Sequence, residues 1–118
     1  MSELTRWRDI YKALDDAGVD TYSPGQHKGE CLSKYAVVKQ DGSTAAYEFS
    51  SSVMYYKILC YCPQNEYSTL ETFLSTVKQA MKALEPMIMY AQQQDAPYYD
   101  EDVKGWMVAI RYRNYIKL

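Results

Sequence analysis

The run VMYYKILCYC, residues 53–62, alternates in polarity with a period of two residues. Successive side chains of a β-strand point to opposite faces of a sheet, so the run predicts one strand with two different faces. The even-numbered residues form the more apolar face, which holds Met54, Tyr56, Ile58, Cys60 and Cys62. Lys57 lies on the odd-numbered face, which we therefore expect to be the wetter one. We predict that Cys60 and Cys62 are small buried residues on the core side and that Pro63 ends the strand.

Extended structure is also predicted before this strand. Residues 19–22 read as a short extended piece, and residues 31–40 (CLSKYAVVKQ) and 43–52 read as strands. Asp41-Gly42 lies between the two longer runs and is typical of a tight hairpin turn. We therefore expect the chain to reverse its direction at residues 41–42.

The C-terminal third predicts one more long strand. Residues 87–90 (MIMY) indicate a short strand, residues 91–102 a polar loop, and residues 105–118 the long strand. Alternation in the long strand separates two sets of side chains. Those expected to face the core are Trp106, Val108, Ile110 and Tyr112, and those expected to face outward are Met107, Ala109, Arg111, Arg113 and Tyr115.

Two segments have apolar residues at helical spacing. The first covers residues 4–17, with Ser2 as a candidate cap and Gly18 at its end. The second begins with a predicted capping box of Ser68 and Glu71 and is stopped by Pro86. Its buried stripe comprises Leu70, Phe73, Leu74, Val77, Met81 and Leu84.

The order helix, strands, helix, strands predicts an α+β fold. We expect a largely antiparallel sheet with both amphipathic helices packed on one face. At 118 residues, the chain is long enough to close one hydrophobic core, and we expect a single domain over residues 1–118.

Composition excludes several classes of protein. Thirteen Lys and Arg residues against fifteen Asp and Glu residues give a formal net charge of −2, which offers no support for nucleic-acid binding. No apolar run approaches the roughly 20 residues of a membrane-spanning helix, and the N-terminus lacks the features of a signal peptide. We therefore expect no membrane partner and a reducing environment. Cys31, Cys60 and Cys62 are then expected to be free thiols. Thirteen tyrosines against two phenylalanines suit either half-wet protein interfaces or a sheet rich in tyrosine.

No catalytic, cofactor-binding or metal-binding site is predicted. His27 and Cys31 lie in the loop GQHKGEC, whereas Cys60 and Cys62 lie in a strand at a spacing tighter than the usual zinc knuckle. The loop leads into a strand and not into a helix, so it does not match a phosphate-binding loop. Its two glycines favour a flexible surface loop, and we expect its residues to be exposed.

Three segments are candidates for contacts with other proteins. The first is Gln26, His27 and Lys28 in the glycine-flanked loop, and the second is Asp100, Glu101 and Asp102 in a polar loop without EF-hand spacing. The third is Arg111, Arg113 and Tyr115 on one face of the last strand. A nucleic-acid platform resembles the third segment, but the acidic composition favours a protein-contact face or a plain solvent face.

Two quoted runs carry a resemblance to a known family. The run IYKALDDAGVDTYSPGQHKGECLSKYAVVK and the ending YYDEDVKGWMVAIRYRNYIKL resemble tail terminator, or tail completion, proteins of tailed phages and prophages, and the run YYKILCYCPQNEYSTLETFLSTVKQAMKAL is similar to the middle of that family. The resemblance implies a virion protein, assembled in the host cytoplasm, that forms a ring, commonly a hexamer, on the head-proximal end of the tail tube. Such a ring ends tube growth and contacts a neck or head-completion protein, and DNA passes through its lumen without specific binding. The implied fold is a sheet flanked by helices.

Two other functions stay open at the level of sequence. A head–tail joining protein has similar size and composition. A small cytoplasmic ligand-binding domain or enzyme would need a pocket with convergent polar groups, which a sequence does not reveal.

Overall fold

The computed structural model describes residues 6–46 and 51–117, with side chains for residues 6–43 and 53–114. A helix and a short strand come first, and two long strands follow. The elements are α1 (Trp7–Asp16), β1 (Thr21–Tyr22), β2 (Tyr35–Ala46), β3 (Ser51–Pro63), the 3-10 turn η1 (Gln64–Thr69), α2 (Leu70–Met81), the 3-10 turn η2 (Lys82–Leu84), β4 (Met89–Gln94), β5 (Tyr98–Asp100) and β6 (Gly105–Lys117).

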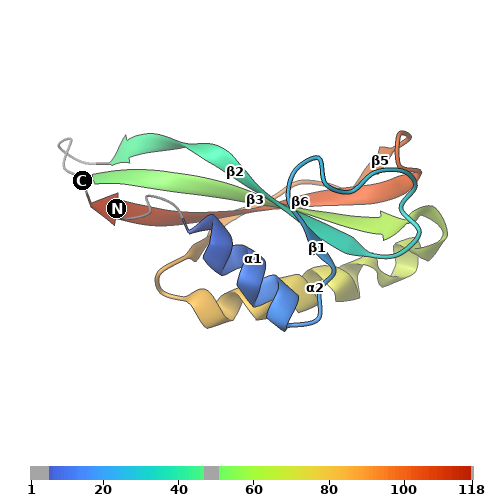
Figure 1. Cartoon of the computed structure of the whole chain (residues 1–118), viewed down its shortest axis with the longest axis horizontal. Helices are drawn as coiled ribbons and strands as arrows, with labels where there is room; N and C mark the ends of the chain where they lie inside the picture. The colour runs from blue at the N-terminus through green and yellow to red at the C-terminus, as the bar shows by residue number, and fades with distance from the viewer. Residues whose placement is uncertain (1–5, 47–50, 118) are drawn as a thin grey trace.

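These strands form one mixed sheet in the order β1-β2-β3-β6-β4, and β5 also pairs with β6. The β1–β2 pair is parallel and the others are antiparallel. Both helices lie against the same face of the sheet (Figure 1). The predicted α+β fold is confirmed.

The main core lies between the helices and this face, which we call the helix-side face. Even-numbered residues of β3 and β6 meet the apolar stripes of the two helices, as the alternation in the sequence predicts. Fully buried members of this core include Ile10, Leu14, Ile58, Cys60, Cys62, Val77, Val108 and Ile110. The face assignments of both long strands are therefore confirmed for the described side chains, which do not include that of Tyr115.

Polar groups fix the start of α1 to the sheet. The Trp7 indole N–H donates to the carbonyl of Val38 (2.7 Å) on the edge of β2. The Tyr56 hydroxyl accepts from the backbone N–H of Arg6 (2.8 Å) and donates to Oδ1 of buried Asn114 (2.5 Å). The helix ends where the N–H of Val19 reaches back to the carbonyl of Leu14 (3.0 Å), as predicted for an end at residue 18. The candidate cap Ser2 lies outside the described residues.

The predicted hairpin turn at Asp41-Gly42 is wrong. β2 runs through this dipeptide, and its register with β3 shifts between Gln40 and Ser43, which is a β-bulge. Gly42 has φ +88°, a conformation that favours glycine both in a tight turn and in a bulge. Because Ala46 pairs with Ser51, the chain reverses between those two residues. The Asp-Gly dipeptide, typical of a tight turn, therefore forms a bulge here.

The predicted capping box of Ser68 and Glu71 is also wrong. The turn η1 runs directly into α2, whose N-cap residue Thr69 makes no side-chain cap hydrogen bond. The Leu70 N–H donates instead to the carbonyl of Tyr67. Upstream carbonyls of a 3-10 turn can satisfy N–H groups that a side chain would otherwise cap.

Residues 91–102, predicted as a loop, contain most of β4 and all of β5. Both strands pair with β6 along its outer edge, β4 at residues 110–113 and β5 at residues 105–107. The side chains of residues 92–94 are exposed, so this edge pairing leaves no apolar period in the sequence.

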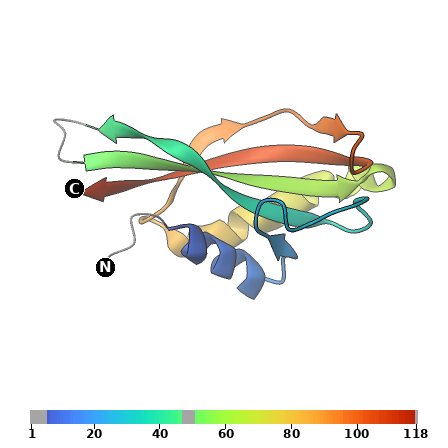
Figure 2. The same cartoon turned by 45° about the horizontal axis from the view of Figure 1, so that its top comes forward.

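The distal parts of β2, β3 and β6 extend beyond the helices. We call these parts the arm: residues 43–46, 51–54 and 114–117. Figures 1 and 2 both show the three strands continuing past the start of α1. The molecule measures 48 × 26 × 25 Å, and its strands run along the long axis.

Candidate interaction surface on the sheet

The face of the sheet opposite the helices, the far face, has an apolar half and a charged half. Tyr35, Val37, Leu59 and Tyr61 form the apolar half. The next residues along the strands on this face are Lys39, Lys57 and Arg111, which are cross-strand partners in register. Three cations thus form one row across β2, β3 and β6. Like charges directly opposite one another oppose sheet formation.

Two carboxylates partly neutralise this row. Asp41, in the bulge of β2, lies 3.7 Å from Nζ of Lys57 and 3.7 Å from Nε of Arg111. Nη1 of Arg111 donates to Oδ1 of Asp95 at 2.7 Å. The bulge therefore brings a carboxylate within reach of two of the three cations. Lys39 is exposed, and no described residue forms a salt bridge with it.

Arg113 extends the positive charge toward the arm. It follows Arg111 on the same face and pairs in register with Tyr55 on one side and Met89 on the other. Its Nε is buried and has no hydrogen-bond partner among the described residues. A buried N–H group without a hydrogen-bond partner lowers the stability of the folded state. We call Lys39, Lys57, Arg111 and Arg113 the basic cluster. Tyr115 is the next residue of β6 on this face after Arg113, but its side chain is outside the described part of the chain.

The loop with the single histidine covers the apolar half. His27 stacks on Tyr35 with ring centroids 3.9 Å apart, Tyr35 stacks on Tyr61 at 4.6 Å, and Tyr22 contacts His27 edge-on at 5.0 Å. We call these four residues the aromatic cluster. His27 is partly buried, so the expectation that it is exposed is wrong, because flat aromatic partners on the sheet give the imidazole a packing site.

The neighbours of His27 match the expected exposure. Gln26 and Lys28 are exposed. Gln26 also closes the turn before His27, because its side-chain Oε1 accepts from the N–H of Ser23 (2.9 Å) and its backbone N–H donates to the carbonyl of Ser23 (3.1 Å). The loop is therefore ordered by its own hydrogen bonds and by the stack on the sheet.

The end of this loop contacts the turn between β5 and β6. The Cys31 N–H donates to the carbonyl of Val103 (2.7 Å), and Glu30 pairs with Lys104 at 3.5 Å. Gly105 leaves room for this contact, because a Cβ there would lie 2.8 Å from Cβ of Cys31. Residues 30–31 and the turn between β5 and β6 therefore lie side by side.

That turn is strongly acidic. We call Asp100, Glu101 and Asp102 the acidic turn. Oδ1 of Asp100 accepts from the N–H of Asp102 (3.0 Å), and the side chains of Glu101 and Asp102 are exposed. With neighbouring Glu30, four carboxylates stand against the one ammonium of Lys104. The turn lies at the end of the molecule opposite the arm (Figure 1).

All three cysteines are free and buried, and they are divided between the two faces. Cys60 and Cys62 belong to the helix-side core, whereas Cys31 lies under the loop. Burial raises the pKa of Cys31 to about 11 and that of Cys60 to about 12. Within the described part of the chain, no three His, Cys, Asp or Glu residues are grouped as metal ligands.

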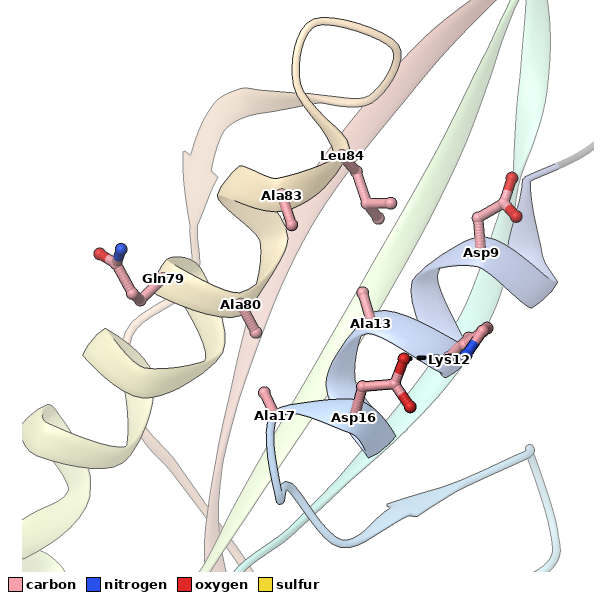
Figure 3. Close-up of a pocket in the computed structure, with 9 residues that line it drawn as sticks. All are labelled: Asp9, Lys12, Ala13, Asp16, Ala17, Gln79, Ala80, Ala83 and Leu84. Atoms are coloured by element: carbon pink, nitrogen blue, oxygen red, sulfur yellow. Dashed lines mark hydrogen bonds and ion pairs between the residues drawn. The ribbon is translucent and has the colours of Figure 1, made fainter.

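A groove between α1 and α2 has a volume of about 480 Å³. Its walls are mainly alanine methyl groups, from Ala13, Ala17, Ala80 and Ala83 (Figure 3). Lys12 and Asp16 on its rim pair with each other at 2.9 Å. The polar groups of the groove therefore do not converge on a common point, as those of a small-molecule site do.

The sequence revealed only half of the basic cluster. Arg111 and Arg113 were identified, but Lys39, Lys57 and Asp41 come from other strands. Their meeting depends on the strand register and on the bulge, neither of which the alternation pattern specifies. The position of Lys57 on the wetter face of its strand was the one available signal.

No protein-family model matches the chain, and no curated protein matches it. In the part of the chain that the structure describes, no helix is long and apolar enough to cross a membrane.

Proposed function

We propose that this protein is a structural subunit of a phage tail, which forms a ring on the head-proximal end of the tail tube. The ring, a hexamer by the family resemblance, ends tube growth and offers a surface to a neck or head-completion protein. DNA passes through its lumen, and the subunit catalyses no reaction. The site of action is the virion, after assembly in the host cytoplasm. The proposal combines the resemblance in the sequence with one structural observation, the arm.

The arm supports this role because both of its edges are open. β1 pairs with only Ala36 and Val37 of β2, so no described strand pairs with the outer edge of residues 43–46. On the other side, β4 and β5 pair with β6 no further than Arg113. Open edges expose backbone N–H and C=O groups that another chain can bind, and monomeric proteins usually protect them.

The residues at the edge formed by β2 strengthen this argument. Residues 43–46 are Ser-Thr-Ala-Ala, without the charged residues or prolines that usually block edge pairing. A ring of head-to-tail contacts would give each open edge a neighbour and would close without free ends. Small uncharged edge residues therefore favour an assembly subunit over a protein that acts as a monomer.

The experiment is to mix purified protein with isolated tail tubes and, separately, with DNA-filled heads lacking tails. The expected result is co-sedimentation with tubes, with a ring-shaped cap at one tube end in electron micrographs. Binding to heads alone would favour the head–tail joining function. Binding to neither particle would contradict the proposal.

A further inference from the structure

We propose that a second copy of this chain docks its acidic turn on the basic cluster of the far face. This contact rests on the proposed function, because it assigns two surfaces to the head-to-tail association of subunits.

The basic cluster is not needed to hold the sheet together. Its row of three cations opposes strand pairing, and burying Nε of Arg113 without a partner adds a further cost. Asp41 and Asp95 supply two negative charges against four positive ones. The far face therefore retains an excess of positive charge that an anionic partner would stabilise.

The acidic turn is the complementary surface on the same chain. It carries three carboxylates on consecutive residues, Glu101 and Asp102 are exposed, and Lys104 there is paired with Glu30. The turn and the basic cluster cannot meet within one subunit, because about six residues of β6, roughly 20 Å, separate Gly105 from Arg111. A contact between different patches of two copies is head-to-tail, the type that closes into a ring.

Nucleic acid is a poorer occupant for this surface. The net charge of the chain is −2, and the acidic turn would repel a phosphate backbone that followed the far face. Asp41 and Asp95 lie within the cluster and would face the same phosphates. A docking protein brings fewer negative charges than a phosphate backbone, and its carboxylates can contact the cations between Asp41 and Asp95.

A charge exchange between two variants tests the contact. The first variant, K39E/R113E, makes the far face acidic, and the second, E101K/D102K, makes the turn basic. Asp100 is retained because its carboxylate orders the turn. Each variant alone should repel itself, whereas their mixture offers two complementary contacts. K39E alone, at an exposed position, replaces the first variant if circular dichroism shows that K39E/R113E is unfolded.

Sedimentation velocity measures the outcome at low salt, from about 10 µM to about 1 mM protein, the range of weak contacts. We expect the wild type to associate, each variant to associate at least about tenfold more weakly, and the mixture to recover. Added salt should weaken the wild-type association.

Three results would overturn the inference: a wild type that stays monomeric throughout, variants that associate like the wild type, or a mixture that does not recover. Binding of a single-stranded DNA oligonucleotide that requires Lys39 and Arg113, without self-association, would assign the cluster to nucleic acid instead. If the variants still cap tail tubes, the proposed function does not depend on this contact. The proposed function would then stand even where the inference about the contact fails.

Discussion

The two faces of the sheet are built from the same strands but hold different kinds of residue. The helix-side face is covered by α1 and α2, and the aliphatic side chains and thiols between the helices and the sheet are buried. Among the described residues, a loop that stacks its imidazole on Tyr35 covers the apolar half of the far face, and the other half presents the basic cluster. One face has the composition of a core and the other that of an interface, so stability and association can be altered separately.

Truncation on the helix-side face should give the largest effect. Leu74 of α2 is buried in the main core, whereas Leu32 in the loop is 80% exposed. Leu74→Ala should lower the free energy of unfolding by about 2–5 kcal/mol, because it removes buried methyl groups and leaves a cavity. Leu32→Ala, the same chemical change, should alter it by no more than about 0.5 kcal/mol. Urea denaturation measures both, and equal losses would show that the two faces do not differ in this way.

The buried hydroxyl of Tyr56 should rank second. Tyr56→Phe keeps the ring but leaves the Arg6 N–H and the Asn114 side chain without their shared partner. We expect a loss of about 1–3 kcal/mol in the free energy of unfolding. Tyr98→Phe, at an exposed tyrosine, is the control and should change little. No difference between the two variants would contradict the inferred role of the hydroxyl.

The aromatic cluster should contribute less than the main core. His27→Ala should cost about 0.5–1.5 kcal/mol, the range for an aromatic pair, whereas Lys28→Ala next to it should cost almost nothing. His27→Phe should retain most of the stability, because a flat ring is preserved. A thermal midpoint for His27→Ala equal to that of the wild type would show that the stack does not hold the loop.

The reactivity of the buried thiols can be compared between the two faces of the sheet. Cys60 and Cys31 have raised pKa values, about 12 and about 11 against an ordinary 9.0, because burial disfavours the thiolate. At pH 8 both should react slowly with iodoacetamide, and Cys31 should react first, since only the loop covers it. Mass spectrometry of labelled peptides measures the order, and faster labelling of Cys60 would contradict it.

The same shifts have a consequence at high pH. The folded protein holds these protons more tightly than the unfolded chain, so the stability they contribute is complete below about pH 9. It should be lost as the pH rises through 11 and 12. A midpoint of urea denaturation that is unchanged between pH 9 and pH 12 would contradict this linkage.

Local periodicity predicted the fold class and the faces of β3, β6 and both helices, because burial on one side leaves a direct trace in the sequence. It failed where the backbone or another segment decides the structure. Asp41-Gly42 suits a turn and a bulge equally, and residues 92–94 lie in an edge strand with exposed side chains. His27 is partly buried because it stacks on Tyr35, which in turn stacks on Tyr61 of the neighbouring strand. Only the strand register determines this arrangement.

Lys39→Gln gives the most direct test of the division between the two faces. The substitution removes one charge from the basic cluster at an exposed position and keeps most of the side chain. Urea denaturation and sedimentation velocity of this one variant are compared with those of the wild type. We expect an unfolding free energy that is unchanged, or higher by up to about 1 kcal/mol as repulsion in the row is relieved, together with weaker association. A loss of stability as large as that of Leu74→Ala, with unchanged association, would contradict it.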